Sequence, residues 1–169
     1  MDRNEILRAL TALGERLHNR GVTADLYVVG GAAITLAYAD RRSTRDIDAV
    51  FEPKMLVYEV AGEVERALGL EPGWLNDAAK GFLVPDPEAG ASFDLPGLRV
   101  TVASPRMLLA LKVLAHRVGE DEEDVRLLAG IVGAQTAAHV LRVAEETFGD
   151  RLDAATRFFV EELFSERGP

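Results

Sequence analysis

Residues 26–51 constrain the fold of this chain more than any other stretch, because short apolar runs there alternate with glycine and polar segments. Leu26–Val29 is a short apolar run that Gly30-Gly31 ends, and such a run predicts a buried strand. Ala32–Ala39 is rich in helix formers and leads into a polar loop. Asp46–Phe51 begins with aspartates on either side of Ile47 and continues with three apolar residues, which indicates a second strand. The stretch therefore predicts a strand, a glycine pair, a short helix, a loop and another strand.

Asp46 and Asp48 are the candidate metal ligands of this stretch. They lie two residues apart on a predicted strand, so both side chains point to the same face. Two neighbouring carboxylates repel each other unless a cation or a proton lies between them. Mg²⁺ binds proteins through one or two carboxylates together with substrate phosphates. The pair therefore predicts a Mg²⁺ site, although two such acids can also be solvated surface residues.

Gly30 and Gly31 open the short predicted helix. A helix that begins in this way offers backbone N–H groups and the positive end of its dipole to a phosphate. A glycine pair by itself is usually a turn. Together with Asp46 and Asp48, however, it forms one unit that can hold both a metal ion and the triphosphate of a nucleotide.

The order of these features resembles a known superfamily. The string G-G-A-A-I-T-L-A-Y followed by T-R-D-I-D-A-V-F is similar to the signature of polymerase-β-like nucleotidyltransferases. It looks most like the minimal branch that includes AbiE-type and MenT-type toxin nucleotidyltransferases, and the resemblance covers roughly residues 20–130. It implies a nucleoside triphosphate as substrate, Asp46 and Asp48 as catalytic residues, and nucleotide-binding residues at Gly30, Gly31, Thr44 and Arg45.

Length and composition restrict the possible fold classes. A chain of 169 residues, 48% of them hydrophobic, can build one domain core. We predict an α/β (α+β) fold with a small mixed sheet and covering helices in residues 1–104. Residues 105–169 are predicted to form a C-terminal helical bundle packed on that core as a single compact unit. The absence of cysteine excludes disulfides and thiolate metal sites.

Net charge and the lack of targeting signals indicate which kinds of partner and which cellular location to expect. The net charge of −9 is unfavourable for general nucleic-acid binding, which depends on phosphate neutralisation, and suits a cationic small molecule or a protein partner. The N-terminus M-D-R-N-E is unlike a signal peptide, and no uncharged apolar stretch reaches the roughly 18 residues of a membrane span. We therefore expect a cytoplasmic protein with no membrane partner.

Apolar periodicity and breaker residues predict the remaining elements. Helices are expected at Arg3–Asn19, Met55–Leu70, Pro105–Val118, Thr136–Phe148 and Asp150–Phe164. Strands are expected at Gly81–Val84 and Leu98–Val102, with an irregular loop over Pro85–Gly97. Trp74 is expected to wedge its loop onto the core, and a base-stacking platform is the alternative. Asn76 and Asp77 are candidates both for lining the cleft and for helix capping.

Lys112 is an unusual residue of the predicted helix Pro105–Val118. It lies among the residues expected to form the apolar face, which are Met107, Leu108, Leu111, Leu114 and Ala115. A lysine in such a position is costly to bury without an anionic partner, and snorkelling to solvent is the alternative. The acidic run Glu120–Asp124 that follows is explained by the favourable interaction of acids with a helix start.

The same region extends the resemblance. The pattern M-L-L-A-L-K-V-L-A-H-R, followed by acid-x-x-D-V-x-x-L, resembles later motifs of the toxin-like branch. It implies that Lys112 contacts nucleotide phosphates and that Asp124 orients Lys112 or completes the active site. Arg117, five residues after Lys112, is a tentative further member.

A third carboxylate is the point at which the sequence departs from the superfamily. Many members carry one on a later strand, but Leu98–Val102 contains no acid. Asp77 or Asp94 could supply it from a loop, and the sequence does not choose between them.

Three functions remain open. The first is Mg²⁺-dependent transfer of a nucleoside monophosphate from a nucleoside triphosphate to tRNA or another macromolecule, as in a toxin-type enzyme with an antitoxin partner. It needs a basic surface, for which the candidates are Arg41, Arg42, Arg45, Arg106 and Lys112. The second is transfer to a small molecule, as in antibiotic-modifying enzymes. The third is a catalytically degenerate module that binds a nucleotide or a partner. The apolar face of the last helix is expected to pack in the core, and an interface with a partner or with a second copy in a homodimer is the alternative. This face consists of Leu152, Ala155, Phe158, Phe159, Leu163 and Phe164.

Overall fold

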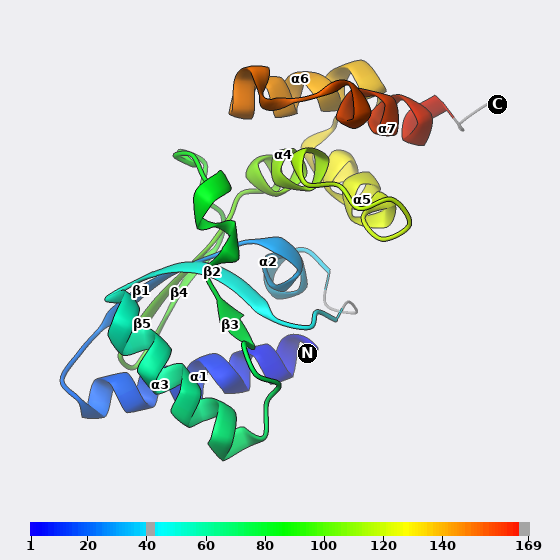
Figure 1. The fold of residues 1–169 in the computed structure, drawn as a ribbon. Coiled ribbons are helices and arrows are strands. Elements are labelled where there is room, and N and C mark those ends of the chain that lie inside the picture. Colours follow the sequence, from blue (N-terminus) through cyan, green and yellow to red (C-terminus); the bar gives the residue numbers. More distant parts are fainter. Residues whose placement is uncertain (40–42, 166–169) are drawn as a thin grey trace. The chain divides into compact units, whose positions relative to one another are not determined.

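The computed structural model describes residues 1–39 and 43–165 of the chain (Figure 1). The chain forms two compact units. The first contains residues 1–83 and 89–103, and the second contains residues 84–88 and 104–169. The sheet lies in the first unit, and the second unit is helical.

The first unit is a five-stranded mixed sheet with three α-helices, which confirms the predicted fold class. The strands have the order β3-β2-β1-β5-β4, in which β1 pairs parallel with β5 and antiparallel with β2. The strands are β1 (Ala24–Val28), β2 (Ile47–Glu52), β3 (Leu75–Asn76), β4 (Ser92–Leu95) and β5 (Leu98–Val102). The helices are α1 (Arg3–Asn19), α2 (Gly30–Ala37) and α3 (Lys54–Leu68), and η1 (Ala78–Phe82) is a short 3₁₀ helix.

One face of this sheet forms the core of the first unit. Alternate strand residues on that face are buried, among them Leu26, Ala49 and Val100. Figure 1 shows α1 and α3 packed against each other on one side of the sheet, where they contact β5 and β2 respectively. The residues on the opposite face, such as Tyr27 and Asp48, stay partly exposed. Side-chain alternation therefore separates a core face from an open face.

Several local predictions are confirmed in the first unit. α1 and β5 have the predicted bounds at both ends. Trp74 is 2% exposed, and its Nε1 donates a hydrogen bond to the Ala61 carbonyl oxygen at 3.1 Å. Its ring therefore packs against α3, and the alternative of a base-stacking platform is wrong because the ring faces are buried.

Two other predictions are wrong. Of the residues expected to form a strand at Gly81–Val84, the first two lie in η1 and the last two in no regular element, and the strand next to β2 is β3. The expected loop Pro85–Gly97 contains β4, which pairs antiparallel with β5 across a tight turn at Gly97 (φ of 72°). The short segment S-F-D-L has only two apolar residues, so its strand character comes from pairing with β5 rather than from its own pattern.

The second unit confirms the predicted C-terminal helical bundle. α4 packs against each of the three later helices. The helices are α4 (Pro105–Leu114), α5 (Glu122–Val132), α6 (Ala137–Phe148) and α7 (Ala154–Ser165), with a 3₁₀ turn η2 (Gly149–Arg151). Side chains cap the starts of α4 and α6, since Ser104 Oγ accepts from the Met107 N–H at 3.0 Å and Thr136 Oγ1 from the His139 N–H at 3.2 Å.

The details of α4 and α7 differ from the prediction. α4 ends at Leu114, before the expected Val118. Its buried face consists of Met107, Leu108, Leu109, Ala110 and Val113. Leu111 and Leu114 are only half-buried, because the neighbouring helices pack on a face rotated from the predicted one. α7 begins after Asp153, whose Oδ1 accepts from the Thr156 N–H at 2.8 Å, so Asp150 is not its N-cap. Phe158, expected in the apolar face of α7, is 65% exposed.

No single helix in the described part of the chain is long and apolar enough to cross a membrane. The segments Glu122–Val132 and Ala137–Arg151 meet the length and hydropathy criteria only when taken together, across a bend of 87°.

Candidate active site

The start of α2 lies against the carboxylate of Asp48. Gly30 has a φ of 64°, which is the left-handed conformation that glycine adopts without penalty. A Cβ atom at Gly30 would lie 3.1 Å from Oδ2 of Asp48. The N–H of Val29 donates to the backbone oxygen of Asp48 at 2.9 Å, which holds β2 against the beginning of the helix. Gly30 therefore leaves its Cβ position open beside the carboxylate.

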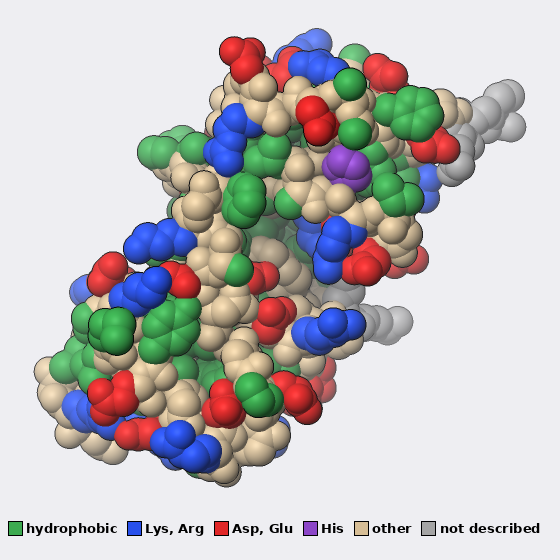
Figure 2. Space-filling model, in the orientation of Figure 1, with side chains coloured by type: hydrophobic (Ala, Val, Ile, Leu, Met, Phe, Trp, Pro, Cys, Tyr) green, Lys and Arg blue, Asp and Glu red, His purple; other side chains and the backbone are tan. Residues whose placement is uncertain are grey.

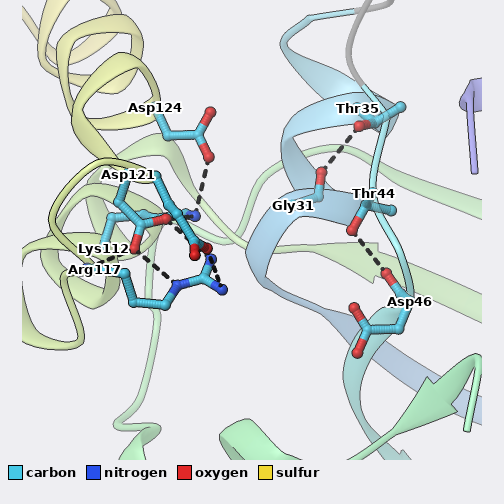
Figure 3. A network of polar contacts seen from close by, with 9 residues as sticks. Gly31, Thr35, Thr44, Asp46, Lys112, Arg117, Asp121 and Asp124 are labelled. Carbon is cyan, nitrogen blue, oxygen red and sulfur yellow. Dashed lines mark hydrogen bonds and ion pairs between the residues drawn. The ribbon is translucent and has the colours of Figure 1, made fainter.

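Gly31 and Thr44 form the next part of the site (Figure 3). A Cβ atom at Gly31 would lie 2.9 Å from Oγ1 of Thr44. That hydroxyl donates to the backbone oxygen of Asp46 at 3.0 Å. The Thr35 hydroxyl, one helical turn after Gly31, donates to the Gly31 oxygen at 3.0 Å. The structure therefore brings the predicted residues Gly31, Thr44 and Asp46 together.

Asp46 lies in a bend directly before β2, and its carboxylate is oriented by Asn76. Nδ2 of Asn76 donates to Oδ2 of Asp46 at 2.9 Å. Oδ1 of Asn76 accepts from the Ala78 N–H at 3.0 Å, so the same side chain also holds the first residue of η1. Asn76 lies on β3 in parallel register with Asp48. Asn76 therefore connects a candidate site carboxylate to the start of η1, whereas the N-cap residue of η1 is Asp77 and makes no side-chain capping bond.

Asp77 and Asp94, the alternatives for a third carboxylate, have different surroundings. Asp77 accepts hydrogen bonds from Lys54 Nζ and from the Tyr58 hydroxyl, both at 2.5 Å. The hydrogen bond from Lys54, and then that from Tyr58, hold the pKa of Asp77 below its ordinary value. Asp94 is exposed on β4, three strands from β2 in the sheet order. Asp77 is thus engaged in its own polar cluster and Asp94 lies on the opposite edge strand.

The basic residues expected around this site are only partly described. Arg45 is exposed in the bend before β2. Arg41 and Arg42 lie outside the described residues. The nucleotide-binding role of Arg45 stays a prediction.

Lys112, Arg117 and Asp124 lie in the second unit, where they meet around Asp121 (Figure 3). Lys112 Nζ lies 2.5 Å from Oδ1 of Asp121 and 3.0 Å from Oδ2 of Asp124. Arg117 donates to Asp121 from its backbone N–H at 2.9 Å and from Nε at 3.2 Å. The Lys112 side chain is 14% exposed, so the snorkelling alternative is wrong, and two carboxylates compensate its burial.

Asp121 is the residue of this cluster that the sequence reasoning missed. Its side chain is 3% exposed and makes no capping bond at the start of α5, so the helix dipole does not explain it. Burial, the largest single influence, would raise the pKa of Asp121. The hydrogen bonds from Arg117 and Lys112 outweigh burial and lower that pKa. The signal was present in the sequence, because a lysine on an apolar face needs an anionic partner and an acidic run follows it.

The residues near Asp48 supply only some of the ligands that a magnesium ion needs. Among the described residues there is no group of three or more His, Asp and Glu side chains that could hold a metal ion. Asn76 pairs in register with Asp48 and donates to the carboxylate of Asp46, so both aspartates lie beside the same residue of β3. The lack of a Cβ at Gly30 lets the start of α2 lie directly beside the carboxylate of Asp48. Two carboxylates fit Mg²⁺ when substrate phosphates and water complete its shell.

Comparison with known proteins bears on the first unit. Residues 5–85 match a family described as a nucleotidyltransferase of unknown function, DUF6036. No curated protein and no solved structure matches the chain. The matched segment runs from α1 past η1 and contains the glycine pair, Asp46, Asp48 and Asn76. The match therefore supports assignment of this segment to the nucleotidyltransferase superfamily.

Proposed function

We propose that this protein is a Mg²⁺-dependent nucleotidyltransferase that moves a nucleoside monophosphate from a nucleoside triphosphate to an acceptor. The observation that carries the proposal is the contact between the left-handed Gly30 and the carboxylate of Asp48. It brings the start of a helix, which suits phosphates, next to carboxylates that suit their metal ion. The family match of residues 5–85 supports the same reaction class.

Each residue has a defined role in this proposal. Asp46 and Asp48 would hold Mg²⁺, which when bound neutralises charge on the phosphates and lowers the pKa of the acceptor hydroxyl. Gly30 and Gly31 present backbone N–H groups to the phosphates. The acceptor oxygen forms a bond to the α-phosphorus, the bond from that phosphorus to the bridging oxygen breaks, pyrophosphate leaves, and the hydroxyl proton passes to water. The role of Lys112 toward the phosphates stays a prediction.

The distribution of charge favours a small-molecule acceptor over tRNA. On the face drawn in Figure 2, the described basic side chains are interspersed with acidic ones instead of forming one continuous basic patch. Arg106 is paired with Glu146, and Lys112 is paired with Asp121, so two residues proposed for an RNA surface are already engaged. The net charge of −9 points the same way. A toxin-type enzyme acting on tRNA with an antitoxin partner is the second candidate, supported by the resemblance alone.

The proposal is tested by calorimetric titration of the four nucleoside triphosphates against the wild-type protein, once with Mg²⁺ and once with a chelator. At least one triphosphate is expected to bind with Mg²⁺ and to lose that binding with the chelator. If none of the four binds under either condition, the proposal is wrong and a partner-binding module becomes the better explanation. Binding without transfer to any acceptor would instead indicate a degenerate enzyme.

Asn76→Ala is expected to weaken Mg²⁺-dependent triphosphate binding by about 10- to 100-fold, as is usual when a partner that orients a metal ligand is removed. The cause is the loss of the hydrogen bond that orients the Asp46 carboxylate. Asn19→Ala, the same change at the exposed end of α1, is the matched control and should bind normally. Equal binding by both variants in the calorimetric titration would show that Asn76 serves only to hold the start of η1.

A further inference from the structure

We infer that a groove on the open face of the sheet binds the acceptor of the proposed transfer and that this acceptor carries an ammonium group. The inference rests on the proposed function, because it deepens the description of the same site. The groove has a volume of about 270 Å³. Its main lining residues are Asp25, Tyr27, Val50, Glu52, Arg99 and Thr101.

The groove lies on the same face of β2 as the candidate catalytic residue Asp48 and begins two residues farther along the strand. Asp48, Val50 and Glu52 alternate on one face of that strand, opposite the buried side chains. At about 3.3 Å per residue, the groove begins ~7 Å from Asp48 and extends to ~13 Å at Glu52. In the neighbouring strands, Val50 pairs with Tyr27, and Tyr27 pairs with Thr101. A molecule lying over this floor can reach Asp48 with one end while its other end lies at Glu52.

The far end of the groove has a negative charge. Glu52, Asp25 and Arg99 lie in one register row across β2, β1 and β5, and Asp94 continues the row on β4. Arg99 makes two hydrogen bonds to Asp25, from Nε at 2.6 Å and from its terminal nitrogen at 2.9 Å. That hydrogen-bonded pair lowers the pKa of Asp25, so the carboxylate is ionised at neutral pH. The positive charge of Arg99 is therefore balanced by Asp25, and the negative charge of Glu52 remains.

Glu52 is the acidic residue available to a ligand at this end. It is exposed, and its Oε2 accepts a hydrogen bond from the backbone N–H of Lys54 at 3.2 Å. The ammonium group of Lys54 is directed to Asp77, with which it makes a 2.5 Å ion pair. The carboxylate of Glu52 can therefore form a charge-assisted hydrogen bond with a ligand ammonium.

These features define the class of acceptor. The half-buried ring of Tyr27 lies in the middle of the floor, where it can contact the body of a small ligand or the face of a cation. The acceptor would be an amine about 13 Å long, with a hydroxyl near Asp48 and an ammonium group at Glu52. A nucleic acid would place phosphates beside this acidic end and would be repelled.

The test uses kanamycin as a cationic polyhydroxylated probe and maltotriose as a neutral probe of similar size. Each is titrated calorimetrically into the full chain with Mg²⁺ and a non-hydrolysable triphosphate analogue present. Kanamycin is expected to bind and maltotriose is not. Glu52→Gln should weaken kanamycin binding at least tenfold, whereas Glu59→Gln, the same change on exposed α3, should leave it unchanged.

Three results would overturn the inference. One is equal binding of the two probes, and another is kanamycin binding that is insensitive to Glu52→Gln. The third is binding of bulk tRNA that is strengthened by Glu52→Gln, which would indicate a macromolecular acceptor. Triphosphate binding is measured on the same samples, so failure of the acceptor site is distinguished from failure of the proposed function. If the triphosphate binds and kanamycin does not, only the inferred acceptor is wrong.

Discussion

Asp48→Asn is expected to weaken Mg²⁺-dependent nucleoside triphosphate binding at least about 100-fold, or ~2.7 kcal/mol, while the protein stays folded. The substitution preserves the size of the side chain but removes the negative charge of Asp48, one of the two carboxylates proposed to hold Mg²⁺. Mg²⁺ prefers charged oxygen ligands, so an amide is a poor replacement. Calorimetric titration with Mg²⁺ measures the loss, and circular dichroism reports the fold.

The matched control for Asp48→Asn is Asp94→Asn, the same chemical change on the opposite edge strand of the same sheet. Asp94→Asn should bind the triphosphate like the wild type. If it loses binding as well, Asp94 acts as the third carboxylate despite its exposed position. If Asp48→Asn is unfolded, the carboxylate has a structural role at the start of α2, and the proposed metal site loses its main support.

Asp121→Asn is expected to destabilise the second unit by about 3 kcal/mol, at the low end of the range for removing one partner of a buried ion pair. Lys112 keeps Asp124 as a partner, which limits the loss. Glu120→Gln is the matched control. Glu120 also pairs with Arg117, but both side chains are more than 60% exposed, so this change should cost less than about 0.5 kcal/mol.

The unfolding measurement can distinguish the two units. Trp74, the only tryptophan, is buried in the first unit, so its fluorescence follows that unit. Far-ultraviolet circular dichroism also follows the helices of the second unit. Urea unfolding of Asp121→Asn should shift the circular dichroism midpoint downward. A shift no larger than that of Glu120→Gln would show that the Asp121 cluster contributes little to stability.

The contribution of Asp121 should also depend on pH. Its pKa in the folded protein lies below the ordinary value of 3.8. The stabilisation is therefore fully present above that ordinary value, and it is lost as the pH falls through the lowered pKa. The difference in unfolding free energy between wild type and Asp121→Asn should be constant from neutral pH to about pH 5 and should shrink below pH 4. A difference that grows on acidification would contradict the ion-pair explanation.

Local patterns predicted the elements whose signals are contained in their own residues. The amphipathic period of α1 and the β-branched run of β5 define both ends of each element. Ser104 and Pro105 mark the start of α4 in the sequence. A hydroxyl cap and a proline at the first helical position act through atoms of the same helical turn, so the signal is local. The glycine pair and the two aspartates at the start of β2, Asp46 and Asp48, likewise identify the candidate site, since both signals lie within a few residues of sequence.

Other features depend on residues that are distant in the sequence. β4 is a strand because β5 is available to pair with it, and its own composition does not specify that state. The buried face of α4 includes Ala110 and Val113 instead of Leu111 and Leu114, because the helices packed against it select that face. Apolar pattern alone does not determine the rotation of a helix when leucines lie on both sides.

The sequence by itself determined the fold class, the glycine pair and the two aspartates on one strand face, because these follow from backbone period and residue chemistry over a few positions. Only the tertiary structure decided that Asn76 orients Asp46 and that Asp121 gathers Lys112 and Arg117. The physical reason is that hydrogen bonds and ion pairs form where folding brings side chains within about 3 Å of each other. Chain separation of 30 residues, as between Asp46 and Asn76, contains no local signal of that approach.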